Sequence, residues 1–340
     1  MRAARRHAIC LTALAASALL AAHAGGIALT RQDFMIPALD AGIELHLRNE
    51  RPARTTTFPV DRVVLFVHGA TFPATVAFDF DMPGGAWMKL MAGRGFDVFG
   101  LDIRGYGGST RPAAMAQEPA ANPPFADTRA ATRDIAAAVD FILRRRGIHE
   151  LTLIGWSWGT TTTAAFAAEH PDKVGRLVLV SPVWLPMIAP KFSGAYRTGT
   201  HDSTRAFMTA GIPPQRVADI SPQAQFEAWW TATLATDPDG ARRTPPVLRS
   251  PNGVLKDFAE IWAAGTPAYD PAAIRAPTLL VVAEWDVITP PAMALALYGQ
   301  LANAAQRRVV LLSEGTHFIA LEKNRTHLIH EVQGFLEEEH

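Results

Sequence analysis

The chain of 340 residues contains one cysteine, and it carries no net charge, with 32 Lys and Arg residues against 32 Asp and Glu residues. A single cysteine excludes an intramolecular disulfide framework and a cysteine-based zinc site. The lack of a basic excess argues against a nucleic acid partner. The sequence also lacks a phosphate-binding P-loop, a dinucleotide-binding fingerprint and zinc-ligand spacing. We therefore expect no metal, nucleotide or flavin cofactor.

The overall composition is that of a folded protein. Hydrophobic residues make up 49% of the chain and charged residues 19%, a balance typical of globular domains and unlike that of disordered chains. The length is sufficient for one large α/β domain or for two ordinary domains. No internal repeat or low-complexity tract divides the chain.

The apolar run near the N-terminus, Ala8 to Leu20, is shorter than the segment of about 20 residues that a membrane-spanning helix needs. It follows a segment with three arginines and no acid, and it precedes the small residues of Ala22-His23-Ala24. These are the three parts of a secretory signal peptide. We expect residues 1–24 to be removed after export to the periplasm or the medium, which leaves no stable membrane anchor. The lone cysteine, Cys10, would be removed with them.

Short apolar runs recur along the remaining chain and predict buried strands, since a strand covered on both faces is apolar throughout. They are Val63–Val67, Phe96–Leu101, Leu151–Ile154, Leu177–Val180, Thr278–Val282 and Arg308–Leu312. Helical patterns lie between them, most clearly from Asp127 to Gly147. Alternating strands and helices predict an α/β fold, with a mainly parallel sheet flanked by helices. Phe34–Pro37 and Ile43–Leu47 suggest an antiparallel hairpin at one edge.

The alternation stops between about Trp184 and Arg275, where prolines and aromatic residues are frequent. We predict three short helices there and no strands. One begins near Ser203. The other two have Ser221 and Ser250 as N-caps, followed by Pro222 and Pro251 at the first helical position. The apolar faces of these helices must pack on something, and the carboxyl edge of the sheet is the nearest apolar surface. We therefore predict a helical cap inserted between two strands of a single domain over residues 25–340.

A G-x-S-x-G sequence, Gly155-Trp156-Ser157-Trp158-Gly159, lies directly between a predicted strand and a predicted helix. The five-residue pattern alone is weak, but this context is the one that exposes a nucleophilic serine on a tight turn. The start of the following helix also favours developing negative charge. We expect Ser157 to be a nucleophile rather than a buried turn residue.

Two further residues lie in loops after later predicted strands. Asp286 follows Thr278–Val282, and His317 follows Arg308–Leu312. Because parallel strands end at one edge of a sheet, both should lie near Ser157. A serine hydroxyl needs a base, and a neutral imidazole needs a third group to orient it. The backbone N–H groups of Ala70 and Trp158 are the expected oxyanion donors.

The chain resembles the α/β-hydrolase superfamily over nearly all of its mature length. The resemblance lies in HGAT from His68, DIRGYGGS from Asp102, GWSWG around Ser157, AEWD ending at Asp286, and GTHF containing His317. It implies a serine hydrolase with Ser157 as nucleophile, Asp286 as acid and His317 as base. Within the superfamily the chain looks closest to capped esterases and prolyl-aminopeptidase-like members.

The sequence departs from some branches of that superfamily. HGAT replaces the HGGPG-type loop of the aminopeptidases, which argues against recognition of a peptide amine. Dehalogenases and epoxide hydrolases of the superfamily have an aspartate where this chain has Ser157, which argues against halide displacement and epoxide opening. Glu284 is an alternative acid, but Asp286 suits the superfamily loop better.

Aromatic residues are expected to form the substrate pocket, because ligand pockets have mostly apolar walls. The candidates are Phe72, Trp184, Trp229, Trp230 and Trp262, and Phe258 is a further aromatic residue of the cap. Of the two tryptophans beside the nucleophile, we expect Trp156 to pack beneath the turn and Trp158 to face the pocket floor. His327 and His330 lie three residues apart, but without accompanying acidic or cysteine ligands they indicate a solvated helix face rather than a metal site.

The main functional hypothesis is hydrolysis of a carboxylic ester, or an amide or lactone, of a small molecule with an apolar or aromatic part. It would proceed through an acyl-serine intermediate. The same three residues could instead support carbon–carbon bond hydrolysis or cofactor-free peroxidation, since fold does not fix function. A third possibility is a non-catalytic binding protein on the same scaffold. The sequence leaves the oligomeric state open.

Overall fold

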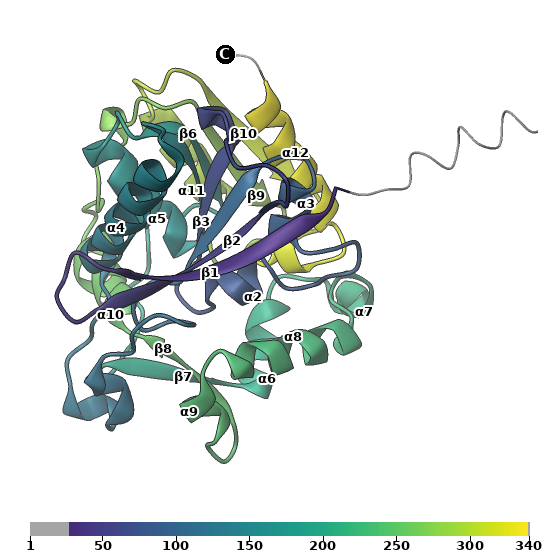
Figure 1. The fold of residues 1–340 in the computed structure, drawn as a ribbon. Helices are drawn as coiled ribbons and strands as arrows, with labels where there is room; N and C mark the ends of the chain where they lie inside the picture. The colour runs from purple at the N-terminus through teal and green to yellow at the C-terminus, as the bar shows by residue number, and fades with distance from the viewer. Residues whose placement is uncertain (1–26, 339–340) are drawn as a thin grey trace, which may run out of the picture.

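The computed structural model describes residues 27–338, so the expected signal peptide lies outside the described residues. Its centre is an eight-stranded sheet in the order β1-β2-β4-β3-β5-β6-β9-β10. Figure 1 shows this sheet with β1 crossing its front. The six strands from β4 to β10 are parallel, whereas β1 and β2 are antiparallel to their neighbours. The strands are β1 Leu29–Pro37, β2 Glu44–Pro52, β3 Val63–Val67, β4 Asp97–Leu101, β5 Leu151–Trp156, β6 Val174–Val180, β9 Thr278–Ala283 and β10 Arg307–Leu312.

The predicted α/β class and mainly parallel sheet are confirmed. All residues of β3, β4, β5 and β9 are buried, which explains why their sequences are apolar without alternation. The edge hairpin is also confirmed, although its strands are longer than predicted. β1 has one largely exposed face that carries polar residues, so apolar runs alone predict only part of the strand.

Helices cover both faces of the sheet. They are α2 Ala74–Ala77, α3 Trp87–Ala92, α4 Thr128–Arg146, α5 Trp158–Glu169, α11 Pro291–Gln300 and α12 Arg325–Glu337. Alternate strand residues join different hydrophobic clusters: Leu65 packs with α4, α5 and α11, and its neighbour Phe66 packs with α2, α3 and α12. Short 3-10 turns complete the connections: Val60–Arg62, Ala113–Ala116, Pro119–Ala121, Pro214–Arg216, Pro271–Ala273 and Ile319–Leu321.

Helix α4 has the ends that its sequence predicts. The Asp127 carboxylate accepts a hydrogen bond of 2.8 Å from the Ala130 N–H, which satisfies a donor that the first turn leaves free. Gly147 ends the helix in the left-handed conformation, with φ 67° and ψ 34°. Glycine adopts this conformation without the strain that a Cβ would cause.

The chain between β6 and β9 leaves the main sheet and gathers below it in Figure 1. Two of its elements are strands, which corrects the prediction of helices only. β7 and β8 pair antiparallel from Tyr196↔Pro251 to Thr200↔Val247. The elements are β7 Tyr196–Thr200, α6 His201–Met208, α7 Val217–Ile220, α8 Gln223–Ala235, α9 Pro238–Ala241, β8 Val247–Pro251, α10 Gly253–Asp257 and a π-helical turn Phe258–Trp262. We call this inserted segment, residues 181–277, the cap.

The predicted helix starts in the cap are partly wrong. Ser250 and Pro251 belong to β8, and α10 begins at Gly253. Ser221 does not cap α8, because its hydroxyl accepts a hydrogen bond of 2.8 Å from Arg205 instead. The helix expected near Ser203 begins at His201, where Thr200 and Ser203 form a reciprocal capping box.

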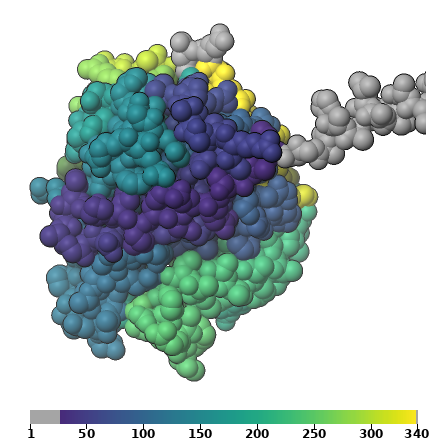
Figure 2. Space-filling view, in the orientation of Figure 1, coloured from purple at the N-terminus to yellow at the C-terminus, as the bar shows by residue number. Residues whose placement is uncertain are grey.

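The space-filling view in Figure 2 shows the purple N-terminal hairpin lying across this face, between the teal α4 region and the green cap. Among residues 27–338, no helix combines the length and apolar character needed to cross a bilayer.

Candidate active site

Ser157 lies on a sharp turn between β5 and α5, with φ 56° and ψ −125°. A non-glycine residue at positive φ is strained and persists only where the surrounding structure enforces it. Its N–H donates to the Val180 carbonyl at 2.9 Å, which ties the turn to β6. The flanking glycines permit close contact, because a Cβ on Gly159 would lie 2.3 Å from the Val67 oxygen and one on Gly155 would lie 2.4 Å from the Gly159 oxygen.

Asp286 and His317 are brought together as the sequence predicts. Nδ1 of His317 lies 2.9 Å from Oδ2 of Asp286, and both residues are buried. Because a carboxylate only accepts hydrogen bonds, Nδ1 carries the proton and Nε2 is left free to act as a base. The alternative acid Glu284 instead accepts from the backbone of Glu314 at 3.1 Å.

Hydrogen bonds hold the Asp286 carboxylate in its charged form. Its oxygens accept from the Ile288 N–H at 2.9 Å and from the Thr289 N–H and hydroxyl at 2.8 Å each. Burial alone would raise the pKa of Asp286, but His317 and the Thr289 donors outweigh burial and lower it. A charged carboxylate beside Nδ1 is what stabilises an imidazolium during proton transfer.

The indole of Trp156 links the nucleophile turn to the loop of His317. Its Nε1–H donates to the His317 carbonyl oxygen at 2.9 Å, and the Trp156 and His317 ring centroids lie 5.8 Å apart. Trp156 is therefore buried beneath the turn, as expected, and it also lines the cavity described below.

The expected position of Trp158 is corrected. Its side chain is fully buried, and its Nε1–H donates to the Thr128 hydroxyl of α4 at 3.0 Å, away from the cavity. Its backbone N–H lies at the first position of α5, where helical N–H groups have no partner within the helix. Trp158 can thus supply the expected oxyanion donor through its backbone alone.

The other expected donor lies in the loop after β3. Gly69 approaches Ser157 so closely that a Cβ there would lie 2.9 Å from the Ser157 Cβ. Among the described residues, the next N–H, that of Ala70, has no hydrogen-bond partner, whereas the Ala70 carbonyl accepts from the Tyr106 hydroxyl at 2.7 Å and from Arg197. This leaves the Ala70 N–H free to bind a developing oxyanion.

His68 fixes the start of that loop. Its Nδ1 lies 2.7 Å from the Gly69 oxygen, and its Nε2 accepts from the Ile103 N–H at 3.1 Å. Accepting at Nε2 requires the neutral ring, and burial lowers the pKa of His68 accordingly. His68 is therefore a positioning residue rather than a second base.

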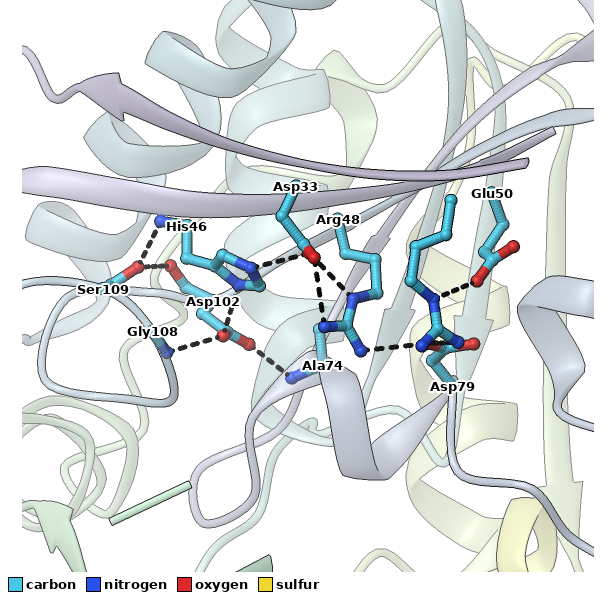
Figure 3. A network of polar contacts seen from close by, with 10 residues as sticks. Asp33, His46, Arg48, Glu50, Ala74, Asp79, Asp102, Gly108 and Ser109 are labelled. Atoms are coloured by element: carbon cyan, nitrogen blue, oxygen red, sulfur yellow. Dashed lines mark hydrogen bonds and ion pairs between the residues drawn. The ribbon is translucent and has the colours of Figure 1, made fainter. Parts of the chain in front are cut away.

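A network of charged residues supports the same loop from behind, as Figure 3 shows. The buried Asp102 carboxylate accepts from the Ala74 N–H at 2.8 Å and from the Gly108 N–H at 3.0 Å, and it lies 2.9 Å from His46 Nδ1. A Cβ on Gly107 would lie 2.0 Å from that carboxylate, which explains the glycine at this position of the DIRGYGGS sequence.

Ser157 and His317 both line one cavity of about 740 Å³ between the carboxyl edge of the sheet and the cap. Of the predicted pocket residues, Phe72 lines it, but Trp184, Trp229, Trp230 and Trp262 do not. These tryptophans are instead buried in the hydrophobic clusters; Trp229, for example, donates to the Val76 carbonyl at 3.0 Å.

Sequence reasoning missed most of the cavity wall. The missed part is formed by aliphatic, methionine, phenylalanine and proline residues from the cap, from the loop after β9 and from α11, together with Arg197: Pro186, Met187, Ile188, Pro190, Arg197, Phe207, Leu255, Val287, Ile288, Pro290 and Met293. Phe258, the other cap aromatic that was expected there, also lines the cavity. The available signal in the sequence is an apolar residue in a predicted loop, such as Ile188 in a proline-rich stretch, which indicates a residue that faces a cavity.

The expectation that His327 and His330 lie on a solvated helix face agrees with their position. His327 and His330 are exposed on α12. Among residues 27–338, no group of three or more His, Cys, Asp or Glu side chains is arranged to hold a metal ion.

The sheet, the strained serine turn and the aspartate–histidine pair define an α/β-hydrolase arrangement. A sequence model of the family described as "alpha/beta hydrolase fold" matches residues 62–324, and the chain belongs to this family. The structure is similar to that of a thermophilic esterase from Thermogutta terrifontis, with a TM-score of 0.56 and 20% identity, over 90% of this chain and 98% of that one.

Two other solved structures have the same fold. A hydrolase from Pseudomonas aeruginosa PA01 has a TM-score of 0.63 and 17% identity, over 90% of this chain and 99% of that one. The 2-hydroxy-6-oxo-6-phenylhexa-2,4-dienoate hydrolase of Rhodococcus sp. strain RHA1 has a TM-score of 0.60 and 16% identity, over 92% of this chain and all of that one.

Proposed function

We propose that the chain is a serine hydrolase that cleaves a carboxylic ester through an acyl-Ser157 intermediate. The observation that carries the proposal is that Ser157 and His317 face one cavity while His317 is paired with Asp286 at 2.9 Å. The family and the esterase among the similar structures support the same chemistry.

In the first half of the reaction, His317 Nε2 takes the Ser157 proton as the serine oxygen bonds to the ester carbonyl carbon. The Ala70 and Trp158 N–H groups bind the resulting oxyanion. Collapse breaks the carbon–oxygen bond, and the proton on His317 passes to the departing alcohol. Water then attacks the acyl-serine with His317 again as base, which releases the acid and restores Ser157.

The lining of the cavity supports an ester with an apolar part. Most of its wall is aliphatic, aromatic or methionine side chain, and a volume of about 740 Å³ matches pockets for small molecules. The test is turnover of 4-nitrophenyl acetate and butyrate by residues 25–340, with Ser157→Ala as the control. The proposal predicts turnover by the wild type and its loss in the variant; full activity in Ser157→Ala would contradict it.

Carbon–carbon bond hydrolysis is the second candidate, supported by the similarity to the Rhodococcus dienoate hydrolase. Analysis of the products formed from a vinylogous 1,5-diketone acid would distinguish it, since an esterase would leave that substrate intact. A non-catalytic binding protein would fail to react with a fluorophosphonate probe.

We also propose that residues 1–24 direct export. Expression of the full chain in a bacterium, followed by N-terminal sequencing of the periplasmic and secreted fractions, should yield a mature protein beginning at Gly25. Recovery of the uncut chain from the cytoplasm alone would contradict export.

A further inference from the structure

Arg197, in strand β7 of the cap, lines the cavity that contains Ser157 and His317. Among the lining residues that the structure describes, it is the single arginine or lysine, and none is acidic. Most of the wall around it is apolar. A cation in such surroundings is costly unless an anion or several hydrogen-bond acceptors compensate it.

The described contacts compensate the guanidinium only in part. One terminal nitrogen donates to the Pro251 carbonyl at 2.6 Å, and the other donates to the Ala70 carbonyl and to the Thr71 hydroxyl at 3.1 Å. None of these three hydrogen bonds uses Nε, and no described carboxylate forms an ion pair with Arg197. Burial lowers the pKa of Arg197, although its interaction with the Tyr106 side chain opposes that shift.

Arg249 and Arg325, which are buried where Arg197 is only partly buried, are compensated more fully. Arg249, two residues from the end of β8, makes a bidentate ion pair with Asp237. Arg325 has no carboxylate, but each of its three nitrogens donates to a backbone carbonyl. Arg197 differs from both in that it faces a cavity and retains an unused donor.

A second, smaller cavity of about 200 Å³ adjoins the first at Arg197. Four residues, namely Thr71, Phe72, Arg197 and Phe207, line both cavities. The rest of the smaller cavity carries hydroxyl groups, from Thr198, Ser203, Thr204 and Ser250, and one glycine, Gly199. The Ser203 and Ser250 hydroxyls already donate to the Thr200 and Thr71 carbonyls. None of the described hydrogen bonds uses the Thr198 or Thr204 hydroxyl, so these two can donate to a carboxylate that the guanidinium binds.

The position of Arg197 relates this polar corner to the proposed reaction. Its side chain donates to the carbonyl of Ala70, the residue whose N–H is the proposed oxyanion donor. An anion bound at Arg197 would therefore lie in the same cavity as an ester carbonyl held at Ser157.

We propose that Arg197 binds a carboxylate of the substrate, so that the preferred substrates are monoesters of short dicarboxylic acids. This inference rests on the proposed function. The free carboxylate occupies the polar corner at Arg197, and the ester carbonyl lies at Ser157 with the alcohol part against the apolar wall. Arg197 is thus a specificity-determining residue and, through Ala70, a support for the oxyanion loop.

The test compares substrates that differ in one charge. Hydrolysis of monomethyl succinate, glutarate and adipate is measured by pH-stat beside their dimethyl esters. For at least one chain length, kcat/KM of the wild type should favour the monoester by roughly 10- to 100-fold, the scale of a charge-assisted hydrogen bond. A wild type that hydrolyses every diester at least as fast as its monoester would overturn the proposal.

Substitutions of Arg197 test whether this residue causes the preference for the monoester. Arg197→Gln should abolish the monoester preference, and Arg197→Lys should retain part of it. Arg242→Gln, which changes an exposed cap arginine outside both cavities, should leave it unchanged. If Arg197→Gln lowers both substrates equally and leaves the preference intact, Arg197 only supports the loop, and the proposal fails.

A binding experiment tests the carboxylate site independently of the proposed ester hydrolysis. In Ser157→Ala, calorimetry should detect glutarate binding more tightly than its diamide, and Arg197→Gln in the same background should remove the difference. Equal binding of acid and diamide contradicts the carboxylate site whatever the catalytic result. Conversely, ester turnover that survives Ser157→Ala contradicts the proposed function whatever the binding result.

Discussion

The indole N–H of Trp156 donates a 2.9 Å hydrogen bond to the backbone carbonyl of His317. The residue before the proposed nucleophile thereby holds the loop that carries the proposed base. The two catalytic loops come from β5 and β10, which are separated in the sheet by β6 and β9. This hydrogen bond therefore helps to hold the loop of Ser157 and the loop of His317 at a fixed separation.

Trp156→Phe removes that hydrogen bond and leaves a buried carbonyl unpaired. We expect a loss of about 1–3 kcal/mol in the free energy of unfolding. We also expect kcat/KM to fall by about 10- to 100-fold, because small displacements of a base are costly. Denaturant unfolding and ester kinetics measure the two effects.

Trp87→Phe is the matched control. Trp87 is also buried against the same face of the sheet, but its Nε1 has no hydrogen-bond partner among the described residues. It should lose less stability and no activity. Equal effects of the two substitutions would show that the indole volume, rather than the hydrogen bond to His317, matters.

Asp286→Asn should lower kcat by about 10³-fold or more while the protein remains folded, because an amide no longer stabilises the imidazolium or fixes its tautomer. Glu284→Gln should leave kcat unchanged, since Glu284 contacts the backbone of Glu314 rather than His317. Ester kinetics with both variants decide between the two acids. A larger loss in Glu284→Gln would reverse the assignment.

His46→Gln should destabilise the fold more at low pH than at high pH. Burial alone lowers the pKa of His46, but the carboxylates of Asp102 and Asp33 outweigh burial and raise it above the ordinary value of 6.5. A raised pKa gives stability that is complete below pH 6.5 and disappears as pH rises through the folded-state value. Melting temperatures of both proteins at pH 6 and pH 9 test this. A difference that is the same at both pH values would contradict it.

Glu322→Gln should stabilise the fold increasingly as pH rises. Burial raises the pKa of Glu322 from 4.5 to about 7, even though Thr316 donates two hydrogen bonds to it. The folded wild type therefore resists ionisation, which costs stability progressively between pH 4.5 and 7. The melting temperature of the variant relative to wild type should grow over that range and level off above it. A constant difference from pH 4.5 to 8 would show that the charge on Glu322 is not the cause.

The main sheet and the positions of Ser157, Asp286 and His317 could be predicted from the sequence because each leaves a local signal. β3 is a run of five buried apolar residues, and its predicted bounds hold. Ser157 lies between two glycines whose close backbone contacts exclude any side chain. Loops at the ends of parallel strands share one edge, so Asp286 and His317 could be placed near each other without knowledge of the packing.

The cap could not be predicted in the same way. β7, with the sequence YRTGT, has neither an apolar run nor a helical period. Its partner β8 contains Arg249, whose burial depends on the ion pair with Asp237, 12 residues earlier in the chain. Tryptophan content suggested an aromatic pocket, but large side chains also fill cores, and Trp229 and Trp262 do so. Arg197 lines two adjoining cavities, and no sequence pattern predicts that position.

The central claim, that Ser157 is the nucleophile, is tested most directly by intact-mass measurement after treatment with a fluorophosphonate. Residues 25–340 should gain the mass of one phosphonyl group, and peptide mapping should place it on Ser157, while Ser157→Ala should gain none. Labelling of the variant to the same extent, or of the wild type at another residue, would contradict the account.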